Sequence, residues 1–259
     1  MMTTMSRVVV VSGVGPGLGR AIAVRSAAAG ADVVLAARTK AFLDEVADDV
    51  TALGGRALVV PTDITSATQC ENLVQATIDA FGRADALVNN AFAMPPMREL
   101  SKVDLDALRE SIDVNVLSTL RLTRLFAPAL AESKGSVVMI NSAVLRHSRR
   151  TFGAYKMAKS ALHAVASSLA TELGPQGIRV NSVAPSYIWA GSLKAYFAYQ
   201  AAKRGVDPQQ IYDEAAAGTD LKRLATPDEI ADAVVFLASD GARAITGQCL
   251  DVNCGEFHT

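Results

Sequence analysis

Short apolar runs alternate with stretches of helical periodicity along the whole chain. Most of these runs are continuously apolar, which is typical of strands that helices cover on both faces of a parallel sheet. They predict strands at Val8–Val11, Val33–Ala37, Ala57–Val60, Ala86–Asn89, Ser136–Ile140, Arg179–Val183 and Cys249–Val252.

The intervening segments carry the periodicity of amphipathic or buried helices. They predict helices at Leu18–Ala29, Ala41–Leu53, Ser66–Phe81, Leu105–Leu130, Phe152–Leu173 and Asp228–Ala238. Regular alternation of strands and helices indicates βαβ units around a parallel sheet. No repeat, low-complexity tract or linker divides the chain. We therefore expect one doubly wound α/β domain over residues 1–259, with a seven-stranded parallel sheet, helices on both faces and a flexible segment at residues 1–6.

One long segment, residues 185–224, interrupts this alternation. Long loops in compact domains usually have a function, and the many aromatic residues here argue against disorder. These aromatic residues are Tyr187, Trp189, Tyr196, Phe197, Tyr199 and Tyr212. Two short helices near Ser192–Ala202 and Pro208–Ala217 would make the segment a cap over a substrate site. The alternative is a contact between subunits.

The charge balance excludes several classes of partner. The chain has 25 basic and 26 acidic residues, which leaves no basic field for nucleic acid and no polybasic patch for a membrane. No apolar run reaches the ~20 residues of a membrane span. Cys70, Cys249 and Cys254 lack the spacing of a disulfide framework, and the scattered histidines lack that of metal ligands, so no metal is expected. No secretory leader is visible, so we expect a cytoplasmic protein that acts on a small molecule.

A glycine-rich turn follows the first predicted strand and opens the first predicted helix. It contains Gly13, Gly15, Gly17, Leu18 and Gly19, directly after Ser12. Glycines let a backbone approach a ligand closely, and a helix N-terminus favours a pyrophosphate. The spacing Gly13-x-x-x-Gly17-x-Gly19 differs from G-x-G-x-x-G, but its strand–turn–helix context still indicates dinucleotide binding. A tight turn without a ligand is the alternative.

The end of the second predicted strand bears on which nucleotide would bind. NAD sites usually have an acidic residue there for the ribose 2′-hydroxyl, whereas this chain has Ala36, Ala37, Arg38 and Thr39. Arg38 can form a charge-assisted contact with a 2′-phosphate. The sequence therefore favours NADP(H), with NAD(H) possible, unless Arg38 only caps the following helix.

Tyr155 and Lys159 are separated by one helical turn in the predicted helix Phe152–Leu173, so both lie on the same face. A lysine in this position can lower the pKa of a tyrosine from its usual value of about 10. Such a tyrosine can exchange a proton near neutral pH, as the reduction of a carbonyl requires. The alternative is a chance pair on a solvated helix face.

Taken together, these residues resemble the short-chain dehydrogenase/reductase family. The resemblance is to its single-domain branch, whose members are close in length to the 259 residues of this chain. The glycine turn resembles the cofactor motif of that family. Asn115, Ser142, Tyr155 and Lys159 occur in the order of its catalytic tetrad. The resemblance covers nearly the whole chain and implies a Rossmann-like fold.

The resemblance also implies a set of cofactor contacts beyond the glycine turn. Asp63 would face the adenine amine, Asn90 and Ala91 would brace the cofactor, and the strand and turn around Pro185 would pass the nicotinamide. The full implied set is Ser12, Gly13, Gly15, Gly17, Leu18, Gly19, Arg38, Asp63, Ile64, Asn90, Ala91, Tyr155, Lys159, Pro185 and Ile188. Implied substrate contacts are Phe92, Val144, Phe152 and Trp189.

Two positions depart from the family pattern. Phe92 stands where the family usually has Gly, so its ring is expected to narrow the cofactor site or to face the substrate. Ser186 stands where Gly often follows Pro185. Between the candidate Ser142 and Tyr155 lies a basic patch, which would attract a carboxylate or phosphate or else form an ordinary solvated loop. The patch consists of Arg146, His147, Arg149 and Arg150.

The mechanism that the resemblance implies is the interconversion of a secondary alcohol and a ketone. The aromatic residues of the cap favour an apolar small molecule as the substrate. Tyr155 would be the general acid or base, Ser142 would polarise the substrate oxygen, and hydride would move to or from carbon 4 of the nicotinamide. Asn115 would lie at a helix distortion that links Lys159 to solvent. Alternatives are a catalytically silent cofactor sensor or scaffold, and a sugar-nucleotide epimerase. Relatives form homo-oligomers, which favours a tetramer over a dimer.

Overall fold

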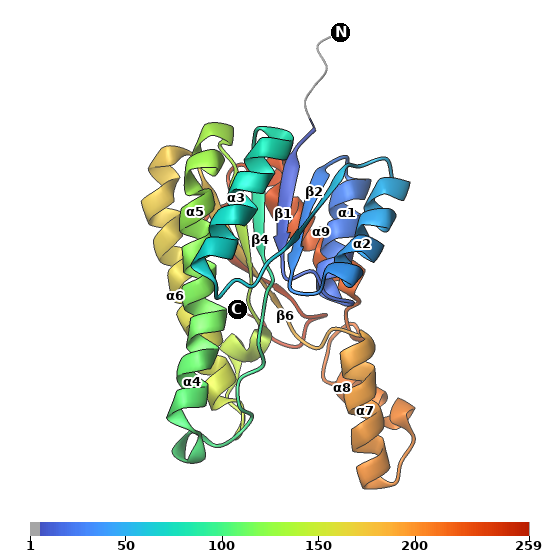
Figure 1. The fold of residues 1–259 in the computed structure, drawn as a ribbon. Helices are drawn as coiled ribbons and strands as arrows, with labels where there is room; N and C mark the ends of the chain where they lie inside the picture. Colours follow the sequence, from blue (N-terminus) through green and yellow to red (C-terminus); the bar gives the residue numbers. More distant parts are fainter. Residues whose placement is uncertain (1–5, 259) are drawn as a thin grey trace.

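A computed structural model describes residues 6–258, so residues 1–5 of the segment expected to be flexible lie outside the described part (Figure 1). The predicted seven-stranded, all-parallel sheet is confirmed, with strand order β3-β2-β1-β4-β5-β6-β7. The strands are β1 Val8–Ser12, β2 Asp32–Ala37, β3 Ala57–Pro61, β4 Ala86–Asn89, β5 Ser136–Ile140, β6 Arg179–Pro185 and β7 Cys249–Val252.

Helices cover both faces of the sheet in one domain. One face carries α1 (Leu18–Ala28), α2 (Lys40–Ala52) and α9 (Pro227–Ala238), and the other carries α3 (Ala67–Phe81), α5 (Ser118–Ser133) and α6 (Gly153–Leu173). Each layer encloses a core of Val, Ile, Leu and Ala side chains. This two-sided burial explains why most strands are continuously apolar.

The long predicted helix Leu105–Leu130 is divided in the structure. It consists of α4 (Leu105–Ile112), a π-helical turn (Asp113–Leu117) and α5, which continues to Ser133. Its apolar periodicity runs on through the division, and neither Gly nor Pro interrupts it there. A single π-helical turn inserts one residue into the helical ladder and is frequent at functional sites. Asn115 lies in this turn, as the expected distortion requires.

Two helical projections extend from the carboxyl ends of the strands. Figure 1 shows α4 on one side, and α7 (Gly191–Arg204) with α8 (Pro208–Ala217) on the other. The two predicted short helices of residues 185–224 are therefore present. They enclose a small core of their own, formed by Phe197, Ala201, Ile211 and Leu224.

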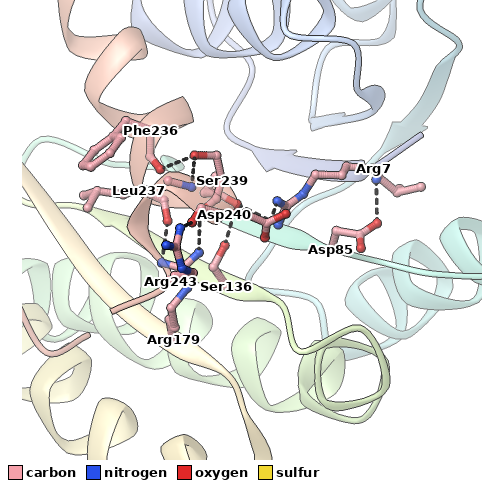
Figure 2. A network of polar contacts seen from close by, with 12 residues as sticks. Arg7, Asp85, Ser136, Arg179, Phe236, Leu237, Ser239, Asp240 and Arg243 are labelled. Atoms are coloured by element: carbon pink, nitrogen blue, oxygen red, sulfur yellow. Dashed lines mark hydrogen bonds and ion pairs between the residues drawn. The ribbon is translucent and has the colours of Figure 1, made fainter. Parts of the chain in front are cut away.

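The amino ends of the strands are held by a polar network on the side away from these projections. Figure 2 shows Arg179 donating to the carbonyls of Leu237 and Ser239, at 2.8 and 3.0 Å. Arg7 pairs with Asp240 at 2.9 Å and also donates to the carbonyl of Ala238. The last carbonyls of a helix lack partners within the helix, and cations are favourable there. The network therefore caps α9 and fixes it to β1 and β6.

Candidate active site

A pocket of about 1120 Å³ opens at the carboxyl ends of β1, β2, β3 and β4. The turns that follow these four strands line it, together with residues of α4, the π-helical turn and the start of α7. Here the strand order reverses, since β1 pairs with β2 on one side and with β4 on the other. Open α/β sheets bind ligands at such a switch point.

The glycine turn forms one wall of the pocket. Gly13 has φ +92°, and a Cβ added to it would lie 2.3 Å from the backbone nitrogen of Ala91. A Cβ on Gly19 would lie 2.3 Å from the carbonyl oxygen of Gly13, whereas Gly15 has no atom within 4 Å. Gly13 and Gly19 are thus required for close backbone packing, and Gly15 leaves open space for a ligand.

The N-terminus of α1 points into the same region. Gly17 is its N-cap residue, and no side chain of the described residues accepts a hydrogen bond at this cap. The first N–H groups of a helix lack partners within the helix, and the macrodipole favours an anion beside them. Gly17 and Leu18 both line the pocket. A dinucleotide pyrophosphate therefore fits this wall.

Asn90 joins the exit of β4 to the glycine turn. Its Nδ2 donates to the carbonyl of Gly13 at 2.6 Å, and its backbone nitrogen donates to the carbonyl of Ser12 at 2.9 Å. Ser12 itself is buried at the end of β1. Asn90 and Ala91 line the pocket, and their contact with a cofactor stays a prediction.

Arg38 and Asp63 line the pocket after β2 and β3, with the buried Ile64 following Asp63. Asp63 Oδ1 accepts hydrogen bonds from the backbone nitrogen and the hydroxyl of Thr65, at 2.9 and 2.7 Å. These bonds, and to a smaller degree the charge of Arg38, lower the pKa of Asp63. The pocket therefore places an exposed guanidinium and an ionised carboxylate where the adenosine half of a dinucleotide would fit.

Ser142 and Tyr155 lie together beyond the end of β5. Ser142 Oγ accepts a hydrogen bond from the backbone nitrogen of Val144 at 3.2 Å. Burial raises the pKa of the Tyr155 hydroxyl, and a hydrogen bond with Ser142 acts in the opposite direction. We predicted a pKa lowered by Lys159, and this prediction is wrong for the geometry described here because desolvation is the dominant cause.

Lys159 is buried one helical turn after Tyr155, at 5% exposure. Its Nζ donates to the carbonyl of Ile140 at 2.7 Å and lies 4.7 Å from the centroid of the Phe92 ring. Burial lowers the pKa of Lys159 to about 7. A buried amine whose pKa lies near neutrality is a feature of functional sites more often than of structural ones.

Asn115 projects from the π-helical turn toward the chain that leaves β4. Its Oδ1 accepts from the backbone nitrogen of Ala93 at 3.0 Å, and its Nδ2 donates to the Ala93 carbonyl at 2.9 Å. Nδ2 also donates to the carbonyl of Ser111 at 2.9 Å. Asn115 therefore fixes the loop that follows β4, a contact that sequence reasoning did not identify.

Pro185 and Ile188 lie at the carboxyl end of β6. Pro185 is the last residue of the strand, two residues beyond the predicted end, and pairs with Val252 of β7. Ile188 forms an isolated bridge with Ala225. The residues just after it line the pocket at the start of α7, and sequence reasoning missed them. They are Ala190, Gly191 and Ser192.

Two aromatic rings lie close to the ring of Tyr155. The rings of Phe92 and Phe152 have their centroids 5.5 and 6.4 Å from that of Tyr155. His147 contacts Phe152 at 5.9 Å and Phe257 at 5.3 Å between centroids. Phe257 was missed because it follows the last strand, and its aromatic character two residues after Gly255 was the only available signal in the sequence.

The other two predicted substrate contacts lie in different surroundings. Val144 is buried in the short 3-10 turn that follows Ser142. Trp189 packs within the core of the cap, with its ring centroid 5.7 Å from Phe197 and 4.6 Å from Tyr212. Its role in substrate binding stays a prediction.

The basic patch after Ser142 is compensated by carboxylates. Each arginine of the patch forms an ion pair, and burial lowers the pKa of His147. The pairs are Arg146 with Asp251 at 3.0 Å, Arg149 with Glu256 at 3.3 Å and Arg150 with Glu99 at 2.6 Å. The patch therefore offers little net charge to an anionic substrate.

Comparisons with known proteins agree on one family. A family model described as Enoyl-(Acyl carrier protein) reductase matches residues 13–256. An uncharacterized oxidoreductase of Methylorubrum extorquens is 38% identical over 96% of this chain and 97% of its own length. The 7alpha-hydroxysteroid dehydrogenase of Escherichia coli is 31% identical over 95% of this chain and 92% of its own length.

Solved structures extend the similarity to the whole fold. A 7alpha-hydroxysteroid dehydrogenase complexed with NADH and 7-oxo glycochenodeoxycholic acid superposes with a TM-score of 0.87 at 30% identity, covering 97% of this chain and 94% of that one. L-Sorbose reductase from Gluconobacter frateurii, complexed with NADPH and L-sorbose, gives a TM-score of 0.91 at 28% identity, covering 98% and 97%.

The chain belongs to the short-chain dehydrogenase/reductase family. It is an oxidoreductase of that family, and its Rossmann-like fold is confirmed. Within residues 6–258 no helix is long and apolar enough to cross a membrane.

Phe92 departs from the short-chain dehydrogenase/reductase pattern without backbone strain. The described non-glycine residues with positive φ are Lys134, Lys222 and Cys254, so Phe92 does not adopt a glycine conformation. Ser186, the second departure, donates a hydrogen bond to the carboxylate of Glu256. This bond fastens the C-terminal segment to the loop after β6, beside the ring of Phe257.

Proposed function

We propose that the chain is an NAD(P)-dependent dehydrogenase/reductase that interconverts a secondary alcohol and a ketone. The observation that carries this proposal is the cluster of Ser142, Tyr155 and Lys159 beyond the end of β5. Phe92 contacts Tyr155 and Lys159 and also lines the dinucleotide-sized pocket, so it connects the two. When bound, the nicotinamide ring supplies or accepts the hydride.

Each of these side chains has a distinct task in the proposed reaction. Tyr155 holds the proton that the substrate oxygen gains or loses. Ser142, hydrogen-bonded to Tyr155, orients and polarises that oxygen. Lys159, fixed by the Ile140 carbonyl, would bond the nicotinamide ribose and, when protonated, would favour negative charge on the Tyr155 oxygen. Asn115 contributes by fixing the loop at Ala93.

We propose NADP(H) as the preferred cofactor, with NAD(H) also accepted. Arg38 lines the pocket directly after β2, and no acidic residue occurs between Ala36 and Thr39. A guanidinium there would form charge-assisted hydrogen bonds with a 2′-phosphate. The similar solved structures contain NADH in one protein and NADPH in another, so the preference rests on Arg38.

We propose an uncharged, largely apolar substrate of at least ring size. Phe92 and Phe152 lie beside Tyr155, Phe257 packs on His147 next to Phe152, and the neighbouring arginines are paired with carboxylates. Burying an anion against such rings without a free cation would be unfavourable. One relative is named for a hydroxysteroid, whose ring system is largely apolar.

We also propose that the chain forms homo-oligomers through α5 and α6, with a tetramer favoured over a dimer. A groove of about 580 Å³ lies between these helices. Its lining combines apolar Leu120 and Val165 with Arg124 and Glu172, a set that complements itself across a two-fold axis. Light scattering after gel filtration should give the tetramer mass, and Ala164→Arg in the same groove should give smaller species.

Turnover with a carbonyl panel tests the proposed function. Purified protein with NADPH or NADH and a panel of cyclic and acyclic ketones should consume the reduced cofactor, measured as loss of its absorbance. Tyr155→Phe should lose roughly 10²–10⁴-fold in kcat, as expected for an acid–base group, and should keep its cofactor affinity. Tyr199→Phe, at an exposed position on α7, is the matched control.

Two results would contradict the proposal. One is tight cofactor binding with no turnover on any ketone or alcohol of the panel, which would favour the silent sensor. The other is full activity of Tyr155→Phe, which would remove the proposed proton donor.

A further inference from the structure

Phe92 separates the pocket from the proposed catalytic pair. Its ring centroid lies 4.7 Å from Nζ of Lys159 and 5.5 Å from the ring of Tyr155. Phe92 also lines the pocket and is 39% exposed there. We propose that Phe92 is a positioning residue whose ring covers Lys159 and Tyr155, and that a binding dinucleotide must displace this ring. The inference rests on the proposed function.

The backbone on either side of Phe92 is fixed. Asn90 Nδ2 bonds the Gly13 carbonyl at 2.6 Å on one side. On the other side, both backbone polar groups of Ala93 bond the side chain of Asn115, at 3.0 and 2.9 Å. The loop is therefore held in place, and the ring moves by rotation of its side chain rather than by opening of the loop.

The contacts of Lys159 require this displacement. An ammonium group has three donors, and one of them bonds the carbonyl of Ile140 at 2.7 Å. The face of the Phe92 ring lies beside the same group as a cation–π partner. In the proposed reaction Lys159 must bond the ribose hydroxyls of the cofactor. The ring has to give up part of its contact before those hydroxyls can reach Nζ.

The Phe92 ring also determines how far Lys159 and Tyr155 are shielded from solvent. Burial is the cause of the low pKa of Lys159, about 7, and the first cause of the raised pKa of Tyr155. The cation–π contact opposes the first effect, because it favours the charged amine. Removal of the ring should therefore admit water and raise the pKa of Lys159.

Other ionisable groups lie on α4, the π-helical turn, the segment after Ser142 and α6 itself. Glu110 and Asp113 line the pocket from α4 and the π-helical turn. Arg146 and His147 follow Ser142, with Arg146 paired to Asp251, and Lys156 on α6 donates to the carbonyl of His147. The variants below leave all of these groups in place, so a change in the titration of Lys159 reports on the cover.

Three substitutions distinguish the burial that the Phe92 ring provides from its cation–π contact with Lys159. Phe92→Gly removes the ring and restores the residue that the family usually has. Phe92→Leu keeps an apolar cover without a π face. Met94→Gly introduces the same residue into the same loop at a side chain that is 64% exposed, and serves as the matched control. Thermal unfolding verifies that all three are folded.

The first measurement is the titration of Lys159 by NMR, without added dinucleotide. Protein labelled with carbon-13 at the lysine ε position gives one signal per lysine, and Lys159→Met assigns the signal of interest. In the parent and in Met94→Gly the midpoint should lie near 7. In Phe92→Gly it should rise by ~1 pH unit or more toward the ordinary value of ~10.4. In Phe92→Leu it should stay low or fall, because the cover remains and the π face is lost.

The second measurement is the affinity for NADPH and NADH, followed by cofactor fluorescence. A ring that must move reduces the apparent affinity by the fraction of molecules in which it is already displaced. Phe92→Gly should therefore bind both cofactors more tightly, by ~3–10-fold if the displaced fraction is ~10–30%. Met94→Gly should bind as the parent does.

Both measurements need no carbonyl substrate, so they remain decisive even if no turnover is found. A raised midpoint together with tighter cofactor binding in Phe92→Gly supports the cover, whatever the carbonyl panel shows. An unchanged midpoint overturns it. Weaker cofactor binding in Phe92→Gly also overturns it, because Phe92 would then be a fixed wall that the nicotinamide packs against.

Discussion

Gly13 offers a sharp test of how the glycine turn is built. Its φ is +92°, and an added Cβ would lie 2.3 Å from the nitrogen and 2.4 Å from the Cα of Ala91. Both are backbone atoms held by Asn90, so they cannot yield as a flexible side chain would. The unfavourable φ costs about 1–2 kcal/mol and the overlap about 1–3 kcal/mol. Gly13→Ala should therefore be destabilised by roughly 3 kcal/mol.

The matched variant is Gly15→Ala, two residues away in the same turn. Gly15 is not among the described glycines with positive φ, and an added Cβ would meet no atom within 4 Å. Its stability should match that of the parent. The added methyl group projects into open space of the pocket, so the expected effect is on cofactor affinity alone.

Thermal unfolding without added cofactor measures the difference between the two variants. In a domain of this size, each kcal/mol shifts Tm by about 2–4 °C, so Gly13→Ala should unfold about 10 °C below the parent. Gly15→Ala should unfold within about 1 °C of it. If Gly13→Ala unfolds together with Gly15→Ala, the close approach to Ala91 does not constrain the turn, and the reasoning from added Cβ atoms fails.

Three further substitutions test other parts of the structure. Arg38→Ser should weaken NADPH binding by about 10–100-fold and NADH binding little, because the charge-assisted hydrogen bond to the 2′-phosphate is lost. Equal losses for both cofactors would contradict the assignment of Arg38 to the 2′-phosphate. Arg179→Met should lower Tm by about 5 °C through the freed carbonyls at the end of α9, with cofactor affinity unchanged. Lys159 has a folded pKa of about 7, below the ~10.4 of an unfolded lysine, so the unfolded chain binds more protons in between and stability rises with pH across that window. Lys159→Met should remove this rise, which is about 3 kcal/mol between pH 7 and pH 9.5, as measured by urea unfolding at these two values.

The sheet and the position of the cofactor pocket could be predicted because both depend on local patterns. A run such as Val8–Val11 is apolar on both faces and has one stable location, between two helical layers. The glycine turn follows it directly, so the switch point of the sheet coincides with Gly13. The helix that carries Tyr155 and Lys159 was equally clear, since its periodicity is continuous from Gly153 to Leu173.

The mouth of the site could not be predicted, because its residues meet only through tertiary contacts. Arg146 pairs with Asp251, and His147 packs on Phe257, across about a hundred residues of sequence. Without its partners, the basic patch was compatible with either an anionic ligand or an ordinary solvated loop. The π-helical turn at Asn115 was also invisible as an element, because apolar periodicity continues through it; only the resemblance to a family indicated a distortion there.

The direction of the pKa shift of Tyr155 shows what spacing alone leaves out. Four residues of separation place Lys159 on the same face of α6 as Tyr155, and this geometry suggested a charged lysine that would lower the tyrosine pKa. The structure adds burial, which disfavours the charged form of both groups and lowers the pKa of Lys159 to about 7. A lysine that is only partly protonated at neutral pH cannot fully stabilise a tyrosinate. Any activation of Tyr155 must therefore come with a change in the surroundings of Lys159, and the Phe92 ring is the contact of that amine which can move without breaking the backbone of the site.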